Sequence, residues 1–334
     1  MDLSIVIVNW NVKELLQRCL LSLGGVATRV PSAPATEVVV VDCASSDGSV
    51  EMVRREFAWV RLIASDENLG YAGGNNLGMA EATGRYLLIL NPDTEVVGDT
   101  LATMVRYLDE NPPVGALGPQ LQYPDGTLQS SRRRFPTLAT AFWESTLLHQ
   151  WFPSNRVARL YHLADRPADV PQPVDWLVGA ALMIRREAWQ QAGPLDEGFF
   201  MYFEELDWCR RCRKAGWEIH YLPAAKIVHY EGKSSQQVVT AAVIRFQRSK
   251  VRYFQKYYGP GWALVVRFFL LGTFAFQLCE EWLKWLIGHK RELRRERVAS
   301  YWQVLRSGLA AQGKQLDSGH LSAAGAAHRL DERR

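Results

Sequence analysis

Residues 37–48, EVVVVDCASSDG, and residues 86–95, YLLILNPDTE, contain the pattern that decides the fold class. Each begins as a short apolar run and ends with an aspartate in a turn-forming segment. Residues 4–8 and 60–64 are further runs of this kind, and the segments between the runs repeat leucine at a helical period. Such alternation predicts an α/β fold with a mostly parallel central sheet flanked by helices. Because these sheets bind ligands beyond the carboxyl ends of their strands, the residues after each run are the candidate site.

The composition is that of a globular protein with one small basic segment. The chain has 334 residues, 48% of them apolar and 22% charged, which suits two domains or one large domain with an appendage. Its 39 Lys and Arg exceed its 35 Asp and Glu by four. Residues 284–297 hold six basic and two acidic residues, which accounts for this whole excess. A broadly basic surface is therefore disfavoured, and we expect no nucleic-acid partner.

The cysteines and the first residues bear on the cellular compartment. Five cysteines without a regular spacing argue against a secreted disulfide scaffold. Cys209 and Cys212 form a C-x-x-C pair, but no second pair follows at the spacing of a zinc site, so we expect ordinary helix cysteines. The chain begins with a strand-like run rather than a signal-peptide pattern, and a cytoplasmic location is expected.

The residues after the apolar runs are acidic rather than glycine-rich. Asn-Trp-Asn follows the first run, so neither the G-x-G-x-x-G motif of dinucleotide-binding proteins nor a P-loop is present there. Asp42 and Asp93 follow two runs, Glu204 and Glu205 lie in FFMYFEELDW, and His229 follows a later run. These side chains suit a hard divalent cation that helps to hold a diphosphate. The alternative is that each acid only caps a helix or a turn.

Seven motifs occur in an order that resembles the family 2 glycosyltransferases, and among them the bacterial rhamnosyltransferase-like members. The motifs are VNWN, VVVVDCASSDGS, ENLGYAGGNNLG, YLLILNPDTEV, VDWLVGAALMIRREAW, LDEGFFMYFEELDWCRR and KIVHYEG. The resemblance covers about residues 2–232. It implies a GT-A fold, a nucleotide-diphosphate sugar donor, a divalent metal ion (Mn²⁺ or Mg²⁺) and transfer with inversion at the anomeric carbon.

For the donor, the resemblance implies a set of residues at strand ends and in the glycine-rich motif. Asp42, with Asn9 nearby, is expected to bind the base or the ribose. The glycines of ENLGYAGGNNLG are expected to let the backbone approach the donor ahead of a helix N-terminus, although a tight strand-to-helix turn is the alternative. The expected donor-binding residues are Asn9, Asp42, Asn68, Gly70, Gly73, Gly74, Asn75 and Asn91.

For the metal, the resemblance implies two ligands. Asp93 stands at the last position of the family's D-x-D motif, and Asn91 replaces the first aspartate. Asparagine keeps an oxygen or a hydrogen bond but removes a negative charge, so a lower metal affinity is expected. His229 matches the family's late metal-ligand histidine, and a purely structural histidine is the alternative.

For catalysis, the resemblance places the general base in the Glu204-Glu205 pair, with Glu205 where aspartate is usual. A single displacement needs one base on the acceptor hydroxyl, opposite the leaving diphosphate. An acidic first helical turn, favoured by the helix dipole, is the alternative. Asp207 is expected to pair with Arg210 or Arg211. The residues with an expected acceptor contact are Trp176, Asp196, Glu197 and Asp207.

The C-terminal part differs from the rest of the chain. Residues 263–279 contain one charge, Arg267, and tryptophans and the basic segment follow. A polar stripe opposite an apolar face is typical of a helix that lies in a membrane interface, although an amphipathic helix packed on the catalytic domain is the alternative. We therefore divide the chain into a GT-A domain of residues 1–235 (donor half 1–120, acceptor and base half 121–235), a helical membrane-associated segment of residues 236–297 whose residues 262–297 contact anionic lipid, and a flexible tail of residues 298–334.

These expectations combine into one function and one alternative. The chain is expected to be a metal-dependent inverting glycosyltransferase, peripheral on the inner face of the cell membrane. It would move a sugar, with rhamnose suggested by the likeness, to a glycan or polyprenyl-diphosphate-linked acceptor in bacterial cell-surface polysaccharide synthesis. The alternative is a catalytically silent nucleotide- or sugar-binding protein that keeps the fold, since Asn91 and Glu205 depart from the family pattern.

Overall fold

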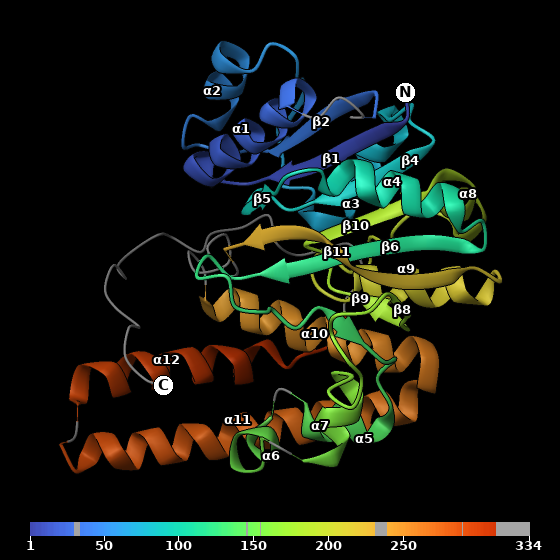
Figure 1. Cartoon of the computed structure of the whole chain (residues 1–334). Helices are drawn as coiled ribbons and strands as arrows, with labels where there is room; N and C mark the ends of the chain where they lie inside the picture. The colour runs from blue at the N-terminus through green and yellow to red at the C-terminus, as the bar shows by residue number, and fades with distance from the viewer. Residues whose placement is uncertain (30–33, 145, 154, 231–238, 289, 312–334) are drawn as a thin grey trace.

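The computed structural model describes residues 1–29, 34–144, 146–153, 155–230, 239–288 and 290–311. Within them, a central sheet has the strand order β3-β2-β1-β4-β10-β6-β11-β5, with β8 paired to β11, while β7 and β9 form a separate ribbon (Figure 1). The strands are β1 (Leu3–Asn9), β2 (Thr36–Cys43), β3 (Arg61–Ser65), β4 (Tyr86–Leu90), β5 (Thr94–Val96), β6 (Val114–Gln122), β7 (Arg132–Arg133), β8 (Gln172–Pro173), β9 (Trp176–Leu177), β10 (Ala181–Arg185) and β11 (Glu218–His229). The helices are α1 (Lys13–Arg29), α2 (Ser49–Glu56), α3 (Gly70–Glu81), α4 (Thr100–Glu110), α5 (Leu138–Trp143), α6 (Leu147–Trp151), α7 (Arg156–Tyr161), α8 (Arg186–Ala192), α9 (Glu204–Lys214), α10 (Val239–Tyr258), α11 (Pro260–Leu286) and α12 (Arg291–Ser307).

The first four strands form the parallel half of the sheet that the sequence predicts. β1 pairs in parallel with β2 and β4, and β2 pairs in parallel with β3. All of β1 is buried, because successive side chains enter different cores on the two faces. Ile5 and Val40 belong to the core that includes side chains of α1, α2 and α4. Val6 and Val41 belong to the core that includes side chains of α3, α8 and α9.

Beyond β4 the sheet becomes mixed. β10 runs antiparallel between β4 and β6, and β5 runs antiparallel to β11, whereas β11 and β6 are parallel. An apolar run does not reveal its direction in a sheet, which depends on the path of the connection before it. The predicted parallel pattern therefore describes the N-terminal half most closely.

The carboxyl ends of β1, β2 and β4 meet at one edge of the sheet. Asn9, the last residue of β1, lies opposite Asp42 in the register of β1 and β2. Asn91 and Asp93 follow directly after β4, and His229, the last residue of β11, lies opposite Thr94 of β5. The polar residues that follow separate apolar runs are thereby gathered in one region, as the parallel topology requires.

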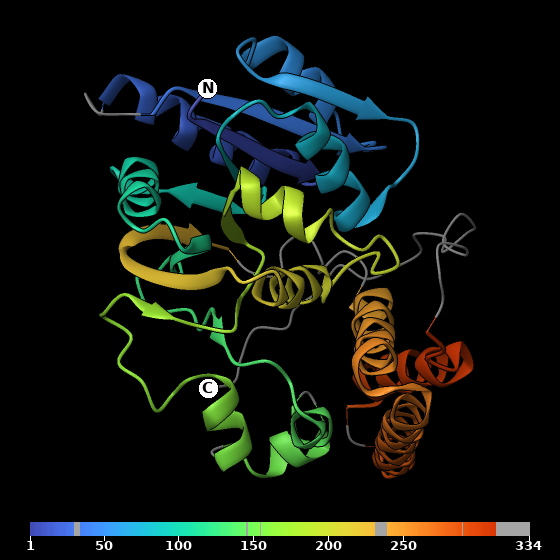
Figure 2. The ribbon, with the colours of Figure 1, turned by 90° about the vertical axis from the view of Figure 1, so that its right-hand side faces the viewer.

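The helices α10, α11 and α12 form a layer of their own beside the sheet (Figures 1 and 2). α12 folds back along α11, where Arg267 donates to the Gly308 carbonyl (2.6 Å) and Arg294 pairs with the buried Glu281. The flexible tail expected from residue 298 does not begin there, because helix α12 continues to Ser307 and buries Val304 against this layer. Residues 312–334 of that expected tail, and the expected domain boundary at 235, lie outside the described residues.

The long segment between β6 and β10 packs on the C-terminal helices as well as on the sheet. Phe142 of α5 meets Phe269 of α11 edge to face, with ring centroids 5.0 Å apart. Trp151 of α6 meets Phe276 of α11 in the same manner, at 6.2 Å. The aromatic residues of this segment, which show no period in the sequence, thus join the sheet domain to α11.

Candidate active site

At the end of β1 and β2, Asn9 and Asp42 form one buried polar unit. The Asn9 Nδ2 atom donates to Asp42 Oδ2 (2.7 Å), and the Ser45 backbone N–H donates to Asp42 Oδ1 (2.9 Å). Both side chains are almost fully buried. The pair therefore fixes the loop after β2.

At the end of β4, Asp93 and His229 stand side by side. Asp93 Oδ1 lies 3.3 Å from His229 Nε2, and both side chains are buried. The Gln129 Oε1 atom lies 2.9 Å from His229 Nδ1 and accepts its hydrogen bond, so Nε2 of a neutral ring turns its lone pair toward the carboxylate. Two electron-rich atoms this close suit a cation between them, and the Gln129 contact orients the ring as metal-binding histidines require.

Asp93 and His229 do not complete a metal site by themselves. Among the described residues, no group of three or more His, Cys, Asp or Glu side chains is placed to hold a metal ion. An ion bound here would take its remaining oxygen ligands from a diphosphate and from water, which is the usual arrangement for magnesium with phosphate substrates. The residues fit such a shared ion.

Helix α9 begins with the Glu204-Glu205 pair, directly after a strained turn. Tyr202 and Phe203, directly before it, both have positive φ angles (70° and 73°), which non-glycine residues rarely adopt. Glu205 Oε1 accepts from the Gly179 backbone N–H (3.3 Å). Oε2 of Glu204 and Oε2 of Glu205 are buried and have no hydrogen-bond partner among the described residues. Strained backbone and unpartnered carboxylate oxygens together are typical of a working site.

Burial sets the electrostatics of the two carboxylates. Desolvation raises the pKa of Glu204 well above its ordinary value of 4.5, and the Glu205 charge raises it further. Desolvation also raises the pKa of Glu205, against the backbone hydrogen bonds that favour its charged form. A carboxylate with a raised pKa and an unpartnered oxygen is chemically prepared to accept a proton.

Tyr71 connects the parts of the site and was not among the predicted residues. Its hydroxyl lies 2.9 Å from Asn91 Oδ1 and 2.7 Å from the Gly179 carbonyl oxygen, beside Glu205, and it can donate its one proton to either oxygen. Burial raises the pKa of Tyr71, and the charges of Glu204, Glu205 and Asp93 raise it further. Its position inside the ENLGYAGGNNLG motif is the sequence signal for it.

A cleft of about 720 Å³, open solvent included, lies at this edge of the sheet. Three of the predicted donor residues line it, namely Asn68, Gly70 and Asn91. Trp10, Tyr71 and Arg245 line it as well, although the sequence motifs did not single them out. The remaining lining residues are Val8, Val12, Cys43, Pro92, Phe200, Met201 and Ala242. The cleft is thus largely apolar, with a few polar groups, as a ligand pocket is expected to be.

The glycine-rich motif is mostly helix rather than an open loop. Helix α3 begins at Gly70, so Gly73, Gly74 and Asn75 are helical. A Cβ atom on Gly74 would lie 2.8 Å from Val8, so this glycine allows close packing of α3 on β1. The buried Asn75 donates to the Tyr71 carbonyl. Tight packing and ligand approach both require a missing side chain, so the motif alone could not distinguish them.

The first backbone N–H groups of α3 are already used inside the protein. The Asn68 Oδ1 atom accepts from the Gly70 N–H (3.0 Å), and the Phe200 carbonyl accepts from the Tyr71 N–H (2.8 Å). The expected anion contact at this helix N-terminus is therefore not open at these two positions. The Gly70 bond closes a local turn within the glycine-rich motif, and the Tyr71 bond joins this motif to the loop before α9.

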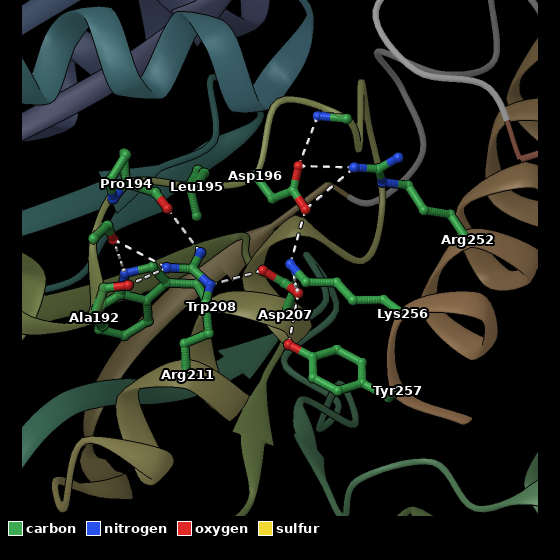
Figure 3. A network of polar contacts seen from close by, with 12 residues as sticks. Ala192, Pro194, Leu195, Asp196, Asp207, Trp208, Arg211, Arg252, Lys256 and Tyr257 are labelled. Carbon is green, nitrogen blue, oxygen red and sulfur yellow. Dashed lines mark hydrogen bonds and ion pairs between the residues drawn. The ribbon is translucent and has the colours of Figure 1, made fainter. Parts of the chain in front are cut away.

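Two residues with an expected acceptor contact are bound in an internal network (Figure 3). Asp196 pairs with Arg252 (3.1 Å) and Lys256 (2.8 Å) of α10. The fully buried Asp207 pairs with Arg211 (2.9 Å), the second of the two expected arginines, and also with Lys256 (2.6 Å). Both carboxylates thereby join α10 to α9 and to the loop that precedes it.

Glu197 and Trp176, the other two residues with an expected acceptor contact, also have contacts within the protein. Glu197 Oε1 accepts from Asn76 of α3 (3.2 Å). Trp176 is 9% exposed, donates from Nε1 to the Arg134 carbonyl and packs against Tyr161. A ring so covered leaves little face for a sugar.

Comparison with known proteins identifies the class. The model of glycosyl transferase family 2 matches residues 4–171. N-acetylglucosaminyl-diphospho-decaprenol L-rhamnosyltransferase of Mycobacterium tuberculosis is 30% identical over 82% of this chain and 91% of its own length. The chain belongs to glycosyl transferase family 2, and it is a rhamnosyltransferase-like glycosyltransferase.

Two solved structures support the GT-A-like fold. GalNAc-T7 with UDP, GalNAc and Mn²⁺ superposes with a TM-score of 0.54 at 16% identity, over 76% of this chain and 48% of that one. The mannosyltransferase PcManGT of Pyrobaculum calidifontis, in complex with GDP-Man and Mn²⁺, gives a TM-score of 0.50 at 20% identity, over 93% and 85%. The expected fold class is thereby confirmed.

Proposed function

We propose that this glycosyltransferase moves a sugar from a nucleotide-diphosphate donor to a hydroxyl of a lipid-linked glycan, with inversion and with help from a divalent metal ion. The observation that carries the proposal is the position of Glu205. Its unpartnered Oε2 is buried at the start of α9, and its other oxygen rests on Gly179, which Tyr71 links to Asn91 in the donor cleft.

The donor would lie in the 720 Å³ cleft with its diphosphate toward Asn91 and Asp93. Asp93 and His229 would hold Mn²⁺ or Mg²⁺, whose charge would stabilise the leaving diphosphate. Trp10 lies in the cleft beside the polar unit of Asn9 and Asp42, which suits stacking on the nucleobase.

The chemical step would need only one protein group to move a proton. Glu205 would accept the proton of the acceptor hydroxyl while that oxygen attacks the anomeric carbon and the bond to the diphosphate breaks. Glu204, which is almost fully buried and has the more strongly unfavourable environment for a charge, would remain protonated beside it. Inversion follows, since attack and departure occur on opposite faces in one displacement.

An anionic membrane is the proposed location of the acceptor. Helix α11 is long and apolar enough to cross a membrane, but only 22% of its most apolar window is buried in the protein. Large apolar side chains are exposed on this helix and at the residue directly after it, namely Trp262, Leu264, Val265, Phe268, Phe276, Trp282, Leu283, Trp285, Leu286 and Ile287. We name them the apolar face of α11. Such a face suits insertion into a lipid interface, and the relative that acts on a decaprenol-linked sugar supports a lipid-linked acceptor.

The position of α12 favours a helix that lies in the interface over one that spans the bilayer. α12 runs back along α11 and carries the exposed Arg291 and Arg295. If α11 crossed the hydrocarbon, these arginines would be drawn in beside it, at a cost of several kcal/mol each (about 2.5–3.5 at the centre of a bilayer). In an interface they would instead meet anionic headgroups at the inner, cytoplasmic face.

The proposal is tested by transfer with purified protein. dTDP-rhamnose, UDP-glucose, UDP-galactose and GDP-mannose would each be offered with N-acetylglucosaminyl-diphospho-polyprenol and Mn²⁺. We expect one donor to give an elongated lipid in the wild type and at least 10²-fold less with Glu205→Gln, while an exposed control, Glu51→Gln on α2, keeps full turnover. Binding of a nucleotide diphosphate without transfer or hydrolysis of any donor would instead support the silent binding protein.

A further inference from the structure

A second pocket lies next to the turn that precedes the proposed base. It has a volume of about 270 Å³, open solvent included, and Phe203, the residue directly before Glu204, lines it. We name it the α5–α10 pocket, because most of its wall comes from these two helices, namely Thr140, Ala141, Phe246, Lys250 and Phe254. The donor cleft has Phe200 and Met201 of the same turn in its wall. The two cavities therefore lie along one short segment that leads to the Glu204-Glu205 pair.

The far wall of the pocket leads to Glu205 by a second route. Tyr161 of α7 lines the pocket, and its ring centroid lies 6.4 Å from that of Trp176 in β9. Three residues after Trp176, the Gly179 backbone N–H donates to Glu205 Oε1. The pocket is thus connected to this carboxylate through Trp176 as well as through Phe203. A substrate that brings a hydroxyl to Glu205 would meet the pocket with the atoms around that hydroxyl.

One wall of the pocket rests on the proposed membrane contact. Phe142 of α5 packs edge to face on Phe269 of α11, with ring centroids 5.0 Å apart. Helix α5 therefore borders the pocket and also packs against the helix that would lie in the lipid interface. An acceptor whose lipid stays at α11 and whose sugar reaches Glu205 would extend along this wall.

A buried cation lines the pocket. Lys250 is only 3% exposed, and its Nζ atom donates to the Glu144 carbonyl (2.6 Å), which is its one hydrogen bond among the described residues. Burial lowers the pKa of Lys250 to about 8, so the side chain is mostly charged at neutral pH. An ammonium has three N–H donors, and a buried charge is costly unless its donors find acceptors. Lys250 can therefore offer a charged hydrogen bond to a ligand in the pocket.

The pocket also contains a carboxylate, which decides between two kinds of ligand. Glu144 Oε2 lies 3.2 Å from His162 Nε2, and Glu144 lines the pocket. Burial acts to raise the pKa of Glu144, but the hydrogen bond and the charge of His162 outweigh it and hold the pKa below the ordinary 4.5. The carboxylate is thus charged at neutral pH, and it would repel a phosphate. A neutral group that both accepts and donates a hydrogen bond suits this pair of charges.

The remaining lining residues supply an apolar wall. Phe203, Phe246 and Phe254 line the pocket, and the Phe203 and Phe246 rings meet each other with centroids 5.4 Å apart. An acetamido group carries the matching parts, because its carbonyl accepts a hydrogen bond, its N–H donates one, and its methyl group is apolar. A sugar hydroxyl in its place has no methyl group for these rings to cover.

We propose that the α5–α10 pocket binds the acetamido group of an N-acetylated acceptor sugar, with Lys250 and Glu144 as specificity-determining residues. The inference rests on the proposed function, because it takes Glu205 as the base and a lipid-linked glycan as the acceptor. Lys250 Nζ donates to the acetamido carbonyl, the Glu144 carboxylate accepts from the acetamido N–H, and the phenylalanine rings cover the methyl group. A charged hydrogen bond of this kind changes binding about 10- to 100-fold, and a site built around it discriminates against a sugar that lacks the group.

The test compares two acceptors that differ only at this group, N-acetylglucosaminyl-diphospho-polyprenol and glucosyl-diphospho-polyprenol, with the donor that the wild type uses. We expect the wild-type kcat/KM to be about 10- to 100-fold higher for the acetamido acceptor. Lys250→Met, which keeps the length of the side chain without its charge, should bring this ratio close to one by lowering kcat/KM for the acetamido acceptor alone. Glu144→Gln should lower the ratio by a smaller factor, because its amide oxygen still accepts a hydrogen bond. Lys226→Met, at an exposed position of β11, should keep the wild-type ratio, and thermal unfolding checks the folding of each variant.

The outcomes separate this inference from the proposed function. A wild type that uses both acceptors with the same kcat/KM keeps the proposed function but overturns the acetamido pocket. If folded Lys250→Met and Glu144→Gln lower kcat/KM for both acceptors by the same factor, the two residues only join α10 to the end of α5, and the inference is also wrong. Failure of the wild type to transfer any sugar to either acceptor would overturn the proposed function itself, and the acetamido pocket with it.

Discussion

The Nζ atom of Lys256 lies 2.6 Å from Oδ1 of Asp207, and this ion pair joins α10 to the helix that begins with Glu204 and Glu205. The Asp207 side chain is completely buried, and it also accepts from Tyr257 (2.7 Å) and Arg211 (2.9 Å). A buried carboxylate that is so well satisfied holds its neighbours in one geometry. Helix α9, which begins with the proposed base, and helix α10 are therefore held in one fixed arrangement.

Removal of the Asp207 carboxylate should destabilise this unit strongly. Asp207→Ala leaves Lys256 and Arg211 without their shared partner, and we expect a loss of about 3–5 kcal/mol in the free energy of unfolding, measured by urea denaturation. Lys256→Met should lose only about 1 kcal/mol, because Arg211 and Tyr257 still bind Asp207. Asp165→Ala, which breaks the exposed pair with Arg134, should lose less than about 1 kcal/mol. Equal losses in the free energy of unfolding of all three variants would contradict the role of Asp207 in joining α9 to α10.

The pH dependence of turnover should report the raised pKa of Glu205. The base acts only when ionised, so activity is lost as the pH falls through its pKa. Because burial raises that pKa, the acid limb of kcat/KM should have its midpoint above 4.5, the ordinary value for a glutamate. A profile of kcat/KM from pH 4.5 to 8.5 checks this. A flat profile down to pH 4.5 would contradict the role of Glu205 as the base.

Because of Glu204, the stability of the protein should fall as the pH rises, whereas its activity should be lost as the pH falls. Its pKa is higher in the folded than in the unfolded protein, so the folded state binds more protons, and stability falls as the pH rises above the unfolded value near 4.5. Each unit of difference costs about 1.4 kcal/mol at neutral pH. Glu204→Gln should therefore raise the melting temperature at pH 7.5 by at least about 2 °C and change it little at pH 4.5. A variant that melts lower than the wild type at pH 7.5 would contradict this account.

Sequence patterns and motifs predicted the polar residues that follow the strands, but not the residues that surround them in the cleft. Asp93 and His229 were found because each follows an apolar run within a recognisable motif, and a parallel topology brings such residues together. Arg245 could not be found in this way, since its cleft neighbours lie far away along the chain and α10 showed only a helical, basic pattern. The pair of Asp207 with Arg211 could be predicted, because the two residues lie four apart on one helix. The ion pairs of Asp196 and Asp207 with Lys256 of α10 join segments far apart along the chain, and no sequence pattern indicates them.

The Gln129 contact should govern metal dependence if Asp93 and His229 hold the ion. Gln129 Oε1 fixes the tautomer and orientation of His229, and loss of such an outer contact typically weakens metal binding about 10- to 100-fold. Gln129→Ala should therefore need about 10- to 100-fold more Mn²⁺ for half-maximal turnover, whereas Gln303→Ala, an exposed position on α12, should need the same amount as the wild type. If Gln129→Ala and the wild type titrate alike, His229 is not a metal ligand.

Membrane binding should depend on two aromatic side chains from different parts of the chain. Phe268 belongs to the apolar face of α11 and is 65% exposed, and Trp151 of α6, 57% exposed, packs edge-on against Phe276 of the same face. The Phe268 ring is largely exposed, whereas Trp151→Gln also removes the ring contact with Phe276, so thermal unfolding of each variant checks that the fold is kept. We expect Phe268→Gln and Trp151→Gln each to reduce flotation with vesicles of phosphatidylethanolamine and phosphatidylglycerol (3:1), with a larger loss in the double variant.

The control for this experiment is Leu21→Gln, because Leu21 is 61% exposed on α1 and lies outside that face. The basic residues of α12 predict a second dependence: replacing phosphatidylglycerol with phosphatidylcholine, or raising the salt concentration, should weaken binding of every variant, since attraction to anionic headgroups is screened. Equal flotation of wild type, Phe268→Gln and Trp151→Gln would exclude the apolar face as the lipid contact. Loss of flotation in Leu21→Gln to the same extent would point to general hydrophobic adsorption. A selective loss in the two aromatic variants would support the apolar face of α11 as the membrane contact, and with it the proposal that the acceptor is linked to a lipid.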